Sequence, residues 1–423
     1  MNDKQKALKE RFFRYVQIPS QSRYNGGVKV PSTESQWDMA KLLMKECEAL
    51  GVQDLALSDK CVLTGRLPAW LPQDHDGYVP AVGFCTHLDT VDVDLSPEVH
   101  PQLVTDYDGK DIVLNTEKNI VMKVSEHLEL LDYVGQDLIV TDGTSVLGAD
   151  NKAATTNVMH ALETLQKDPS IYHGDIYLAF VPDEECGLFG SKSMDYSKFT
   201  PDFAYTIDSC ALGEVVYETF NAGSAFVTIH GISAHPMNAK GVLVNPTLLA
   251  CDFINKFDRQ ETPECTDGKD GYIWCQAVTS NQSRAVVELN IRDHDRQKYE
   301  EKKDRIRRYA KDLADANPRI TVECEITDTY GNIADAITDE NRKAVDYIYD
   351  AFQALSITPN TIAMRGGTDG SFISTKGILT PNYFTGGLNF HSRFEFLPLP
   401  SLEKSCAVTL KLISLIYERA AQK

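Results

Sequence analysis

The chain has 423 residues, and at about 150 residues per domain this length predicts two or three domains. Its 61 acidic and 42 basic residues give a net charge of −19 at pH 7, which disfavours nucleic acid and anionic membranes as partners. No apolar run reaches the ~18 residues of a membrane span, and the first residues are charged and helical, so we expect a cytoplasmic protein. Ten cysteines are scattered without a CxxC pair, as is typical of reduced thiols.

The first half of the chain has the alternating strands and helices of an α/β domain. Amphipathic spacing predicts a helix at residues 4–16 and a second helix from residue 32 or 33 to about residue 51. Short apolar runs predict strands at 81–85, near 147, at 176–181 and at 203–207, with a helix at 152–167 among them. Strands that alternate with helices indicate a mixed, mostly parallel sheet with helices on both faces.

From about residue 214 the pattern changes to that of a two-layer α+β unit. It predicts strands at 225–230, 285–291 and 320–326 and helices at 246–257 and 297–316. The α/β pattern then returns, with helices at 340–355 and 401–421 and a glycine-rich turn at 365–370. We therefore expect one domain formed by 1–213 and 331–423, into which a second domain, 214–330, is inserted.

Potential metal ligands follow four of the apolar runs. His87 and Asp89 follow the first run, and the next three end in Asp150, in Glu184 with Glu185, and in Asp208. Ligands bind at the carboxyl ends of strands in open α/β sheets, and His391 in the returning segment would have to fold back to the same edge. Imidazole and carboxylate ligands suit zinc or another divalent ion, and a carboxylate can bridge two such ions.

Each of these residues also has an ordinary structural explanation. An HxD or EE pair is common by chance, Asp150 could cap the helix that follows it, and Asp208 and His391 could be a loop acid and a packed histidine. The metal site is favoured by the order of the residues at successive strand ends, because clustered carboxylates in an acidic chain require a compensating cation or proton.

Several motifs resemble a known enzyme family. The segments THLDT, LGADNK, PDEECG and YTIDS resemble the dinuclear-zinc exopeptidases related to aminoacylase and carboxypeptidase G. The segments VPSTESQW, AHPMNAKGVLVN, RGGTDGS and NYFTGGLNFHSRFEF are similar to the peptidase T group of aminotripeptidases, and this likeness runs from about residue 12 to residue 415.

The resemblance implies two Zn²⁺ per subunit and a role for each candidate residue. Asp150 would bridge the ions, with His87 and Asp208 completing one site and Glu185 and His391 the other. Glu184 would be the general base and acid, Asp89 would orient His87, and the peptide bond after Asp150 would be cis. The insert would be a lid domain, through which relatives often form homodimers.

Four residues of the insert and the returning segment are implied to contact substrate. His235, in SAHP, would steady the oxyanion, while Arg292 and Arg365 could each clamp a peptide carboxylate. Asn245 is a weaker candidate because Asn before Pro is also a turn signal. The alternatives are a histidine packed in a turn and, for each arginine, an ion pair with an acidic residue.

We thus expect a zinc-dependent aminopeptidase that releases the N-terminal residue of tripeptides by attack of a metal-bridging water. A dipeptidase, a carboxypeptidase or an N-acyl amino acid deacylase would share the same metal ligands. A catalytically silent peptide-binding protein is the rival from another class, although such a protein has no chemical reason to retain Glu184. Cys186 and Cys210 lie near the ligands in sequence, and we expect both to be packed side chains.

Overall fold

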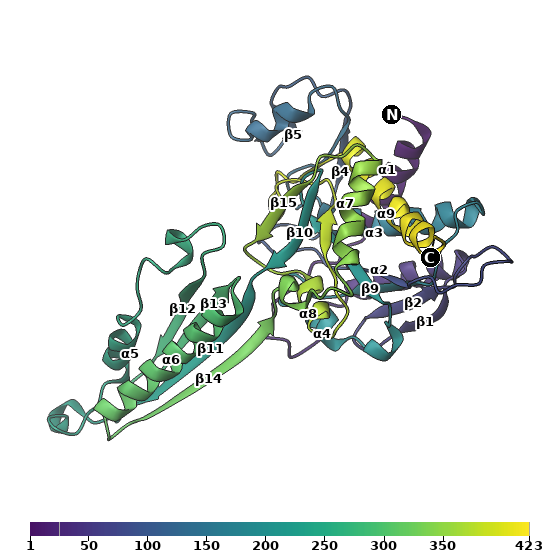
Figure 1. Cartoon of the computed structure of the whole chain (residues 1–423). Coiled ribbons are helices and arrows are strands. Elements are labelled where there is room, and N and C mark those ends of the chain that lie inside the picture. Colours follow the sequence, from purple (N-terminus) through teal and green to yellow (C-terminus); the bar gives the residue numbers. More distant parts are fainter. Residues whose placement is uncertain (25, 423) are drawn as a thin grey trace. The chain divides into compact units, whose positions relative to one another are not determined.

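The computed structural model describes residues 1–24 and 26–422 and divides into two compact units (Figure 1). Unit 1 comprises Met1–Tyr217, Ile337–Ile362 and Thr368–Lys423, and unit 2 comprises Glu218–Ala336 and Ala363–Gly367. No helix among the described residues is long and apolar enough to cross a membrane.

The large sheet of unit 1 is mixed. Its four central strands, β8, β3, β9 and β16, are parallel neighbours, and the antiparallel strands β2 and β10 flank them. Residues of β3 are buried along its whole length, which explains why this strand has an unbroken apolar run rather than an alternating one. In spatial order the strands are β1 (Gln53–Leu57), β2 (Leu63–Leu67), β8 (Ile176–Val181), β3 (Val82–His87), β9 (Phe203–Ser209), β16 (Asn382–Phe384), β10 (Glu214–Thr219) and β15 (Asn360–Met364).

Helices cover both faces of this sheet. The Thr86 hydroxyl of β3 lies 3.0 Å from the Thr155 hydroxyl of α3, whereas the adjacent Cys85 packs in a cluster with Ile373 of α8. Successive strand residues point to opposite faces, so α3 and α8 lie on opposite sides. The helices of unit 1 are α1 (Asp3–Val16), α2 (Gln36–Ala49), α3 (Ala149–Lys167), α4 (Phe189–Ser193), α7 (Lys343–Ala354), α8 (Asp369–Ser374) and α9 (Leu399–Ala420).

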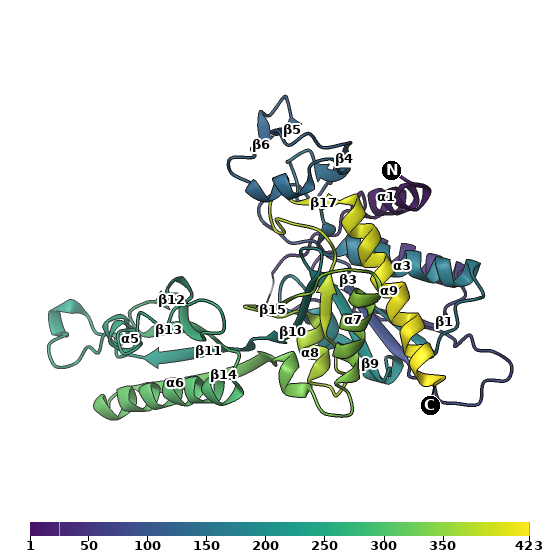
Figure 2. The same ribbon diagram turned by 45° about the horizontal axis from the view of Figure 1, so that its top comes forward.

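A smaller lobe of unit 1 carries two short sheets (Figure 2). Its own apolar cluster includes Leu130, Leu138 and Phe396. The strand expected near residue 147 is wrong, because Leu147 and Gly148 donate their backbone N–H groups to the Glu395 carboxylate instead of to a neighbouring strand. The elements of the lobe are β4 (Pro101–Val104), β5 (Ile112–Asn115), β6 (Ile120–Met122), the 3₁₀ helix η1 (Leu128–Tyr133), β7 (Leu138–Thr141) and β17 (Phe396–Pro398).

Unit 2 is a two-layer α+β unit. Its four-stranded antiparallel sheet has the order β12 (Tyr272–Ser280), β13 (Arg284–Asp293), β11 (Asn221–His230) and β14 (Thr321–Tyr330). The helices α5 (Pro246–Ile254) and α6 (Arg296–Ala316) pack on the sheet and share its apolar core. The chain thus has the expected fold class, a mixed α/β unit with an inserted α+β unit.

Candidate metal centre and active site

Asp150 lies between two histidines from distant parts of unit 1. Its Oδ1 is 2.9 Å from His87 Nε2, and its Oδ2 is 3.2 Å from His391 Nε2. Each carboxylate oxygen therefore faces a different imidazole, which is the arrangement that a bridging carboxylate requires.

Each of the two other predicted ligands lies beside one of these histidines, Asp208 beside His87 and Glu185 beside His391. Asp208 Oδ1 is 3.6 Å from His87 Nε2, and Glu185 Oε2 is 2.9 Å from His391 Nε2. Ligand atoms of His87, Asp150 and Glu185 all lie within 4.8 Å of one another. The structure thus brings together all five residues that the sequence predicts as ligands.

The elements that carry the cluster differ in part from the prediction. His87 ends β3 and Asp208 lies in β9, at the carboxyl edge of the parallel strands, as expected. Asp150 does not end a strand, because it stands in the first turn of α3 and reaches the cluster through a non-helical backbone (φ −80°, ψ 101°). The peptide bond between Asp150 and Asn151 is cis, as the resemblance implies.

The cluster contains more buried negative charge than its own side chains neutralise. Burial and the neighbouring Asp150 carboxylate raise the pKa of Glu185 to about 8 and that of Asp208 to about 6. Hydrogen bonds that the Asp150 and Glu185 carboxylates accept from the His391 ring raise the pKa of His391 to about 11. Glu185 Oε1 is buried and has no hydrogen-bond partner in the described part of the chain. A divalent cation would supply this partner and compensate the charge, so the residues present fit a metal site.

Glu184 belongs to the turn that follows β8. Burial, followed by the nearby carboxylates of Asp208 and Asp369, raises the pKa of its side chain well above the usual range for a carboxyl group. A raised pKa makes the Glu184 carboxylate a stronger base toward water, which is the property that a general base requires.

Asp89 contacts both halves of the site. Its carboxylate oxygens accept the backbone N–H groups of Glu184 (3.1 Å) and Glu185 (3.2 Å), and Oδ1 lies 3.4 Å from His87 Nδ1. The backbone oxygen of Asp89 is closer to that nitrogen, at 3.0 Å. Asp89 therefore orients His87 through both its backbone and its side chain, and it also fixes the turn that carries the two glutamates.

Two further buried acids support the site, and sequence reasoning did not single them out. Glu395 accepts the backbone N–H of Asp150 at 3.1 Å, and burial raises its pKa to about 7. Asp369 starts α8 and is buried, and this burial, followed by the nearby Asp208 carboxylate, raises its pKa to about 7. Both residues lie within quoted motifs, FHSRFEF and RGGTDGS, so the motifs were the available signal.

The four predicted substrate contacts all belong to unit 2. His235 and Asn245 are exposed, and each accepts a backbone N–H two residues further on, from Met237 and Thr247. Asn245 is thereby the N-cap of α5.

The two predicted carboxylate-binding arginines hold parts of unit 2 together. Arg292 donates to the carbonyl of Gly223 at 3.1 Å, and its guanidinium lies over the Tyr330 ring. Arg365 donates to the carbonyls of Gly268 and Asp270, and within residues 1–24 and 26–422 it forms no ion pair with an acidic side chain. Substrate contact by these four residues remains a prediction.

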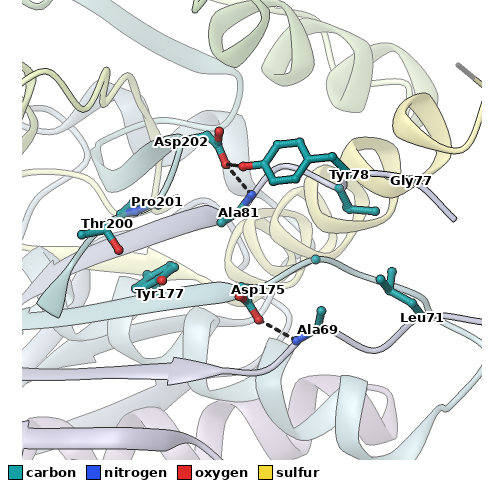
Figure 3. Close-up of a pocket in the computed structure, with 12 residues that line it drawn as sticks. Ala69, Leu71, Gly77, Tyr78, Ala81, Asp175, Tyr177, Thr200, Pro201 and Asp202 are labelled. Carbon is teal, nitrogen blue, oxygen red and sulfur yellow. Dashed lines mark hydrogen bonds between the residues drawn. The ribbon is translucent and has the colours of Figure 1, made fainter. Parts of the chain in front are cut away.

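A separate cavity of about 460 Å³ lies at the other edge of the large sheet. Tyr78, Asp175 and Asp202 line it, and the Tyr78 hydroxyl donates to Asp202 at 2.6 Å (Figure 3). Asp175 and Asp202 directly precede β8 and β9, whereas His87 and Asp208 lie at the opposite, carboxyl ends of β3 and β9. The cavity is therefore not part of the candidate active site.

Comparisons with known proteins identify the family. A peptidase T-like protein of Rhizobium meliloti is 48% identical over 409 residues, which cover 96% of this chain and 98% of the relative. Peptidase T of Fusobacterium nucleatum is 42% identical over 416 residues, which cover 98% and 99%. The chain belongs to the peptidase T family.

The peptidase T fold is also found among solved structures. The aminopeptidase PepT of Bacillus cereus matches with a TM-score of 0.72 at 22% identity, covering 98% of this chain and 99% of the other. A tripeptidase of Staphylococcus aureus matches with the same TM-score and identity, covering 99% of both chains. Residues 217–318 match the family description "Peptidase dimerisation domain".

Proposed function

We propose that this peptidase T family member is a zinc-dependent aminopeptidase that releases the N-terminal residue of tripeptides. The observation that carries the proposal is the position of Asp150, whose two carboxylate oxygens each face a different histidine. Relatives named peptidase T that match over nearly the whole chain support the substrate class.

His87, Asp208 and Asp150 would hold one zinc ion, and His391, Glu185 and Asp150 would hold the other. Zinc bound there would supply Lewis acidity toward a peptide carbonyl and toward water at neutral pH. The donor set of imidazole nitrogens and carboxylate oxygens, without a thiolate, suits this metal.

The chain's own residues would move the proton and hold the substrate. Glu184 takes a proton from the attacking water and returns it to the departing amine. His235 donates to the developing oxyanion, and Arg292 binds the far carboxylate, so that a fixed distance between the metal and this cation selects peptide length. Arg365 and Asn245 are secondary candidates for substrate contact.

We further propose that unit 2 acts as the lid and pairs in a homodimer, for which the family description of residues 217–318 is the support. By the domain bounds expected from the sequence, residues 1–213 and 331–423 form the catalytic domain and residues 214–330 form the lid. A cytoplasmic location is supported by the cysteines, all ten of which are free thiols.

Hydrolysis of matched alanine peptides tests the function. Zinc-loaded protein is incubated with di-, tri- and tetra-alanine and with N-acetyl-trialanine, with and without a chelator. The proposal expects chelator-sensitive cleavage of free trialanine into alanine and a dipeptide, with little cleavage of the other peptides.

The other outcomes point to the rivals. Preference for dialanine indicates a dipeptidase, while cleavage of the acetylated peptide indicates a carboxypeptidase or deacylase. The products separate these two, because a carboxypeptidase releases the last alanine and a deacylase releases acetate. No cleavage by protein that holds two zinc ions supports a silent peptide-binding protein.

A further inference from the structure

His391 is carried by a hairpin rather than by a strand of the large sheet. Leu388 and Phe396 exchange both backbone hydrogen bonds, at 2.9 and 3.1 Å, and close the hairpin around residues 389–395. The side chain of His391 is 48% exposed, and its backbone has a φ of +61°, a left-handed conformation that is uncommon outside glycine.

The histidine on the other side of Asp150 is supported differently. His87 ends a buried central strand, and its side chain is only 2% exposed. The strand and the surrounding core therefore fix His87, whereas the position of His391 depends on whatever holds the hairpin.

Apart from the packing of Phe390, Phe394 and Phe396 against apolar clusters of unit 1, two sets of polar contacts hold the hairpin. Near its second strand, Glu395 accepts backbone N–H groups from the turn before α3 and from Asp150 in the first turn of that helix. Near its first strand, the Asn389 side chain amide donates to Glu129 Oε1 at 2.6 Å and to the Phe394 carbonyl at 3.3 Å. Asn389 thus links the hairpin to the 3₁₀ helix η1 of the smaller lobe.

The η1 side of this link is itself well anchored. Leu130, next to Glu129, is fully buried in the apolar cluster of the lobe. His127 Nδ1 lies 3.2 Å from Glu129 Oε1, and its ring lies 4.8 Å from the ring of Phe394 in the hairpin. Glu129 is therefore a fixed acceptor for the Asn389 amide. The candidate ligand His391 lies only two positions after Asn389.

We propose that Glu129 and Asn389 are positioning residues that hold His391 in place and so set the affinity of the metal site that His391 completes. The inference rests on the proposed two-metal function. It predicts an asymmetry, because His87 and Asp208 lie at strand ends of the large sheet and neither depends on the link between Glu129 and Asn389. Groups that hydrogen-bond a metal-binding histidine directly contribute about 10- to 100-fold to metal affinity, and we take this range as the upper bound for a link that acts through the hairpin backbone.

Metal titration tests this asymmetry. Chelator-treated full-length protein is titrated with Zn²⁺ by calorimetry, and bound zinc is counted after dialysis. Asn389→Gly removes the amide while tolerating the left-handed backbone (φ +58°), and Glu129→Ala removes the acceptor. Each change is expected to lower the affinity for one of the two zinc ions by up to about 10- to 100-fold and to leave the affinity for the other ion unchanged.

Two further variants separate positioning from general damage. Asn389→Asp places two carboxylates together and should lower the affinity for the same zinc ion. Adding Glu129→Gln restores one donor and one acceptor, with their positions exchanged, and should recover part of the lost affinity. Glu126→Gln is the matched control, because Glu126 lies in the same segment but pairs with Lys123 at the surface. It should bind both ions as the wild type does.

The results also distinguish the two proposals. Failure of the wild-type protein to bind a second zinc ion would overturn the proposed two-metal function. If the wild type binds two ions and the Glu129 and Asn389 variants bind both with unchanged affinity, only the positioning role is overturned. Equal weakening of both ions in these variants would also overturn it, because the link would then support the fold rather than His391.

Discussion

Glu184 and Glu185 are adjacent in sequence, yet their surroundings suit them for different tasks. Glu185 lies 2.9 Å from His391, with its second carboxylate oxygen buried and unpaired among the described residues, whereas Glu184 lies among other carboxylates. The two backbone N–H groups are held by one carboxylate, that of Asp89. A single acid thus fixes a proposed ligand and a proposed base relative to each other.

Glu184→Gln tests the proposed base. Glutamine has nearly the same shape but cannot accept the proton from water, so turnover of trialanine should fall by at least about 10²- to 10⁴-fold. The zinc content should remain at two ions because Glu184 is not a proposed ligand. The measurements are kcat for trialanine and zinc content after dialysis, and retained turnover would contradict the assigned role.

At the scale of a single helix, α3 carries Asp150, the proposed bridging acid, at one end and a partly buried histidine, His160, further along. Burial, followed by the nearby Arg11 and Lys4, lowers the pKa of His160 to about 4, and its Nδ1 has no partner in the described structure. In the unfolded chain the His160 imidazole has a pKa of about 6.5, so between pH 6.5 and pH 4 it binds a proton that the imidazole of the folded chain does not bind. This difference lowers stability as pH falls through that window.

His160→Gln should therefore reduce the acid sensitivity of the fold. Glutamine stays neutral, so the variant should lose about 1–2 kcal/mol less stability than the wild type between pH 7 and pH 4.5, the value being reduced because the ring is partly exposed. Thermal melts of both proteins across this pH range measure the difference. Parallel pH curves for the two proteins would show that His160 is not the titrating group.

The start of α5 offers a choice between a structural and a substrate-binding role. Asn245 accepts the Thr247 N–H at 3.0 Å as the N-cap. If capping is its whole role, Asn245→Ala should cost about 1 kcal/mol of stability, and Asn245→Ser should cost little. Melting temperature and kcat/KM are measured for both variants. A large loss of kcat/KM in the Ser variant, with unchanged stability, would instead support substrate contact.

The sequence predicts those parts of the fold that depend on local pattern. The apolar run at 176–181 is β8, and the amphipathic pattern at 297–316 lies within α6, because burial of one strand or one helix face leaves a regular spacing. Short edge strands such as β1 and β15 have no such run and were not predicted. Long-range polar contacts were also missed, since the partner of Asn389 lies 260 residues away and nothing local to either residue indicates the pairing.

At the scale of the whole molecule, the residues proposed for catalysis are divided between the two units. All five proposed metal ligands and Glu184 belong to unit 1, whereas His235 belongs to unit 2, which contains most of the region described as a dimerisation domain. The histidine could therefore serve the ligands of its own chain or those of a second copy. A dimer is essential for activity only in the second case.

Mixing two inactive variants decides between these arrangements. His235→Ala and Glu184→Gln are each expected to lack activity, and both should sediment as dimers. If His235 acts across the subunit boundary, a mixed dimer contains one complete site, made of Glu184 from one chain and His235 from the other. Dissociating and reassociating the variants at equal ratio should then restore roughly a quarter of wild-type activity toward trialanine. If His235 acts within its own chain, each site of the mixed dimer lacks one residue, and the mixture should stay as inactive as its components.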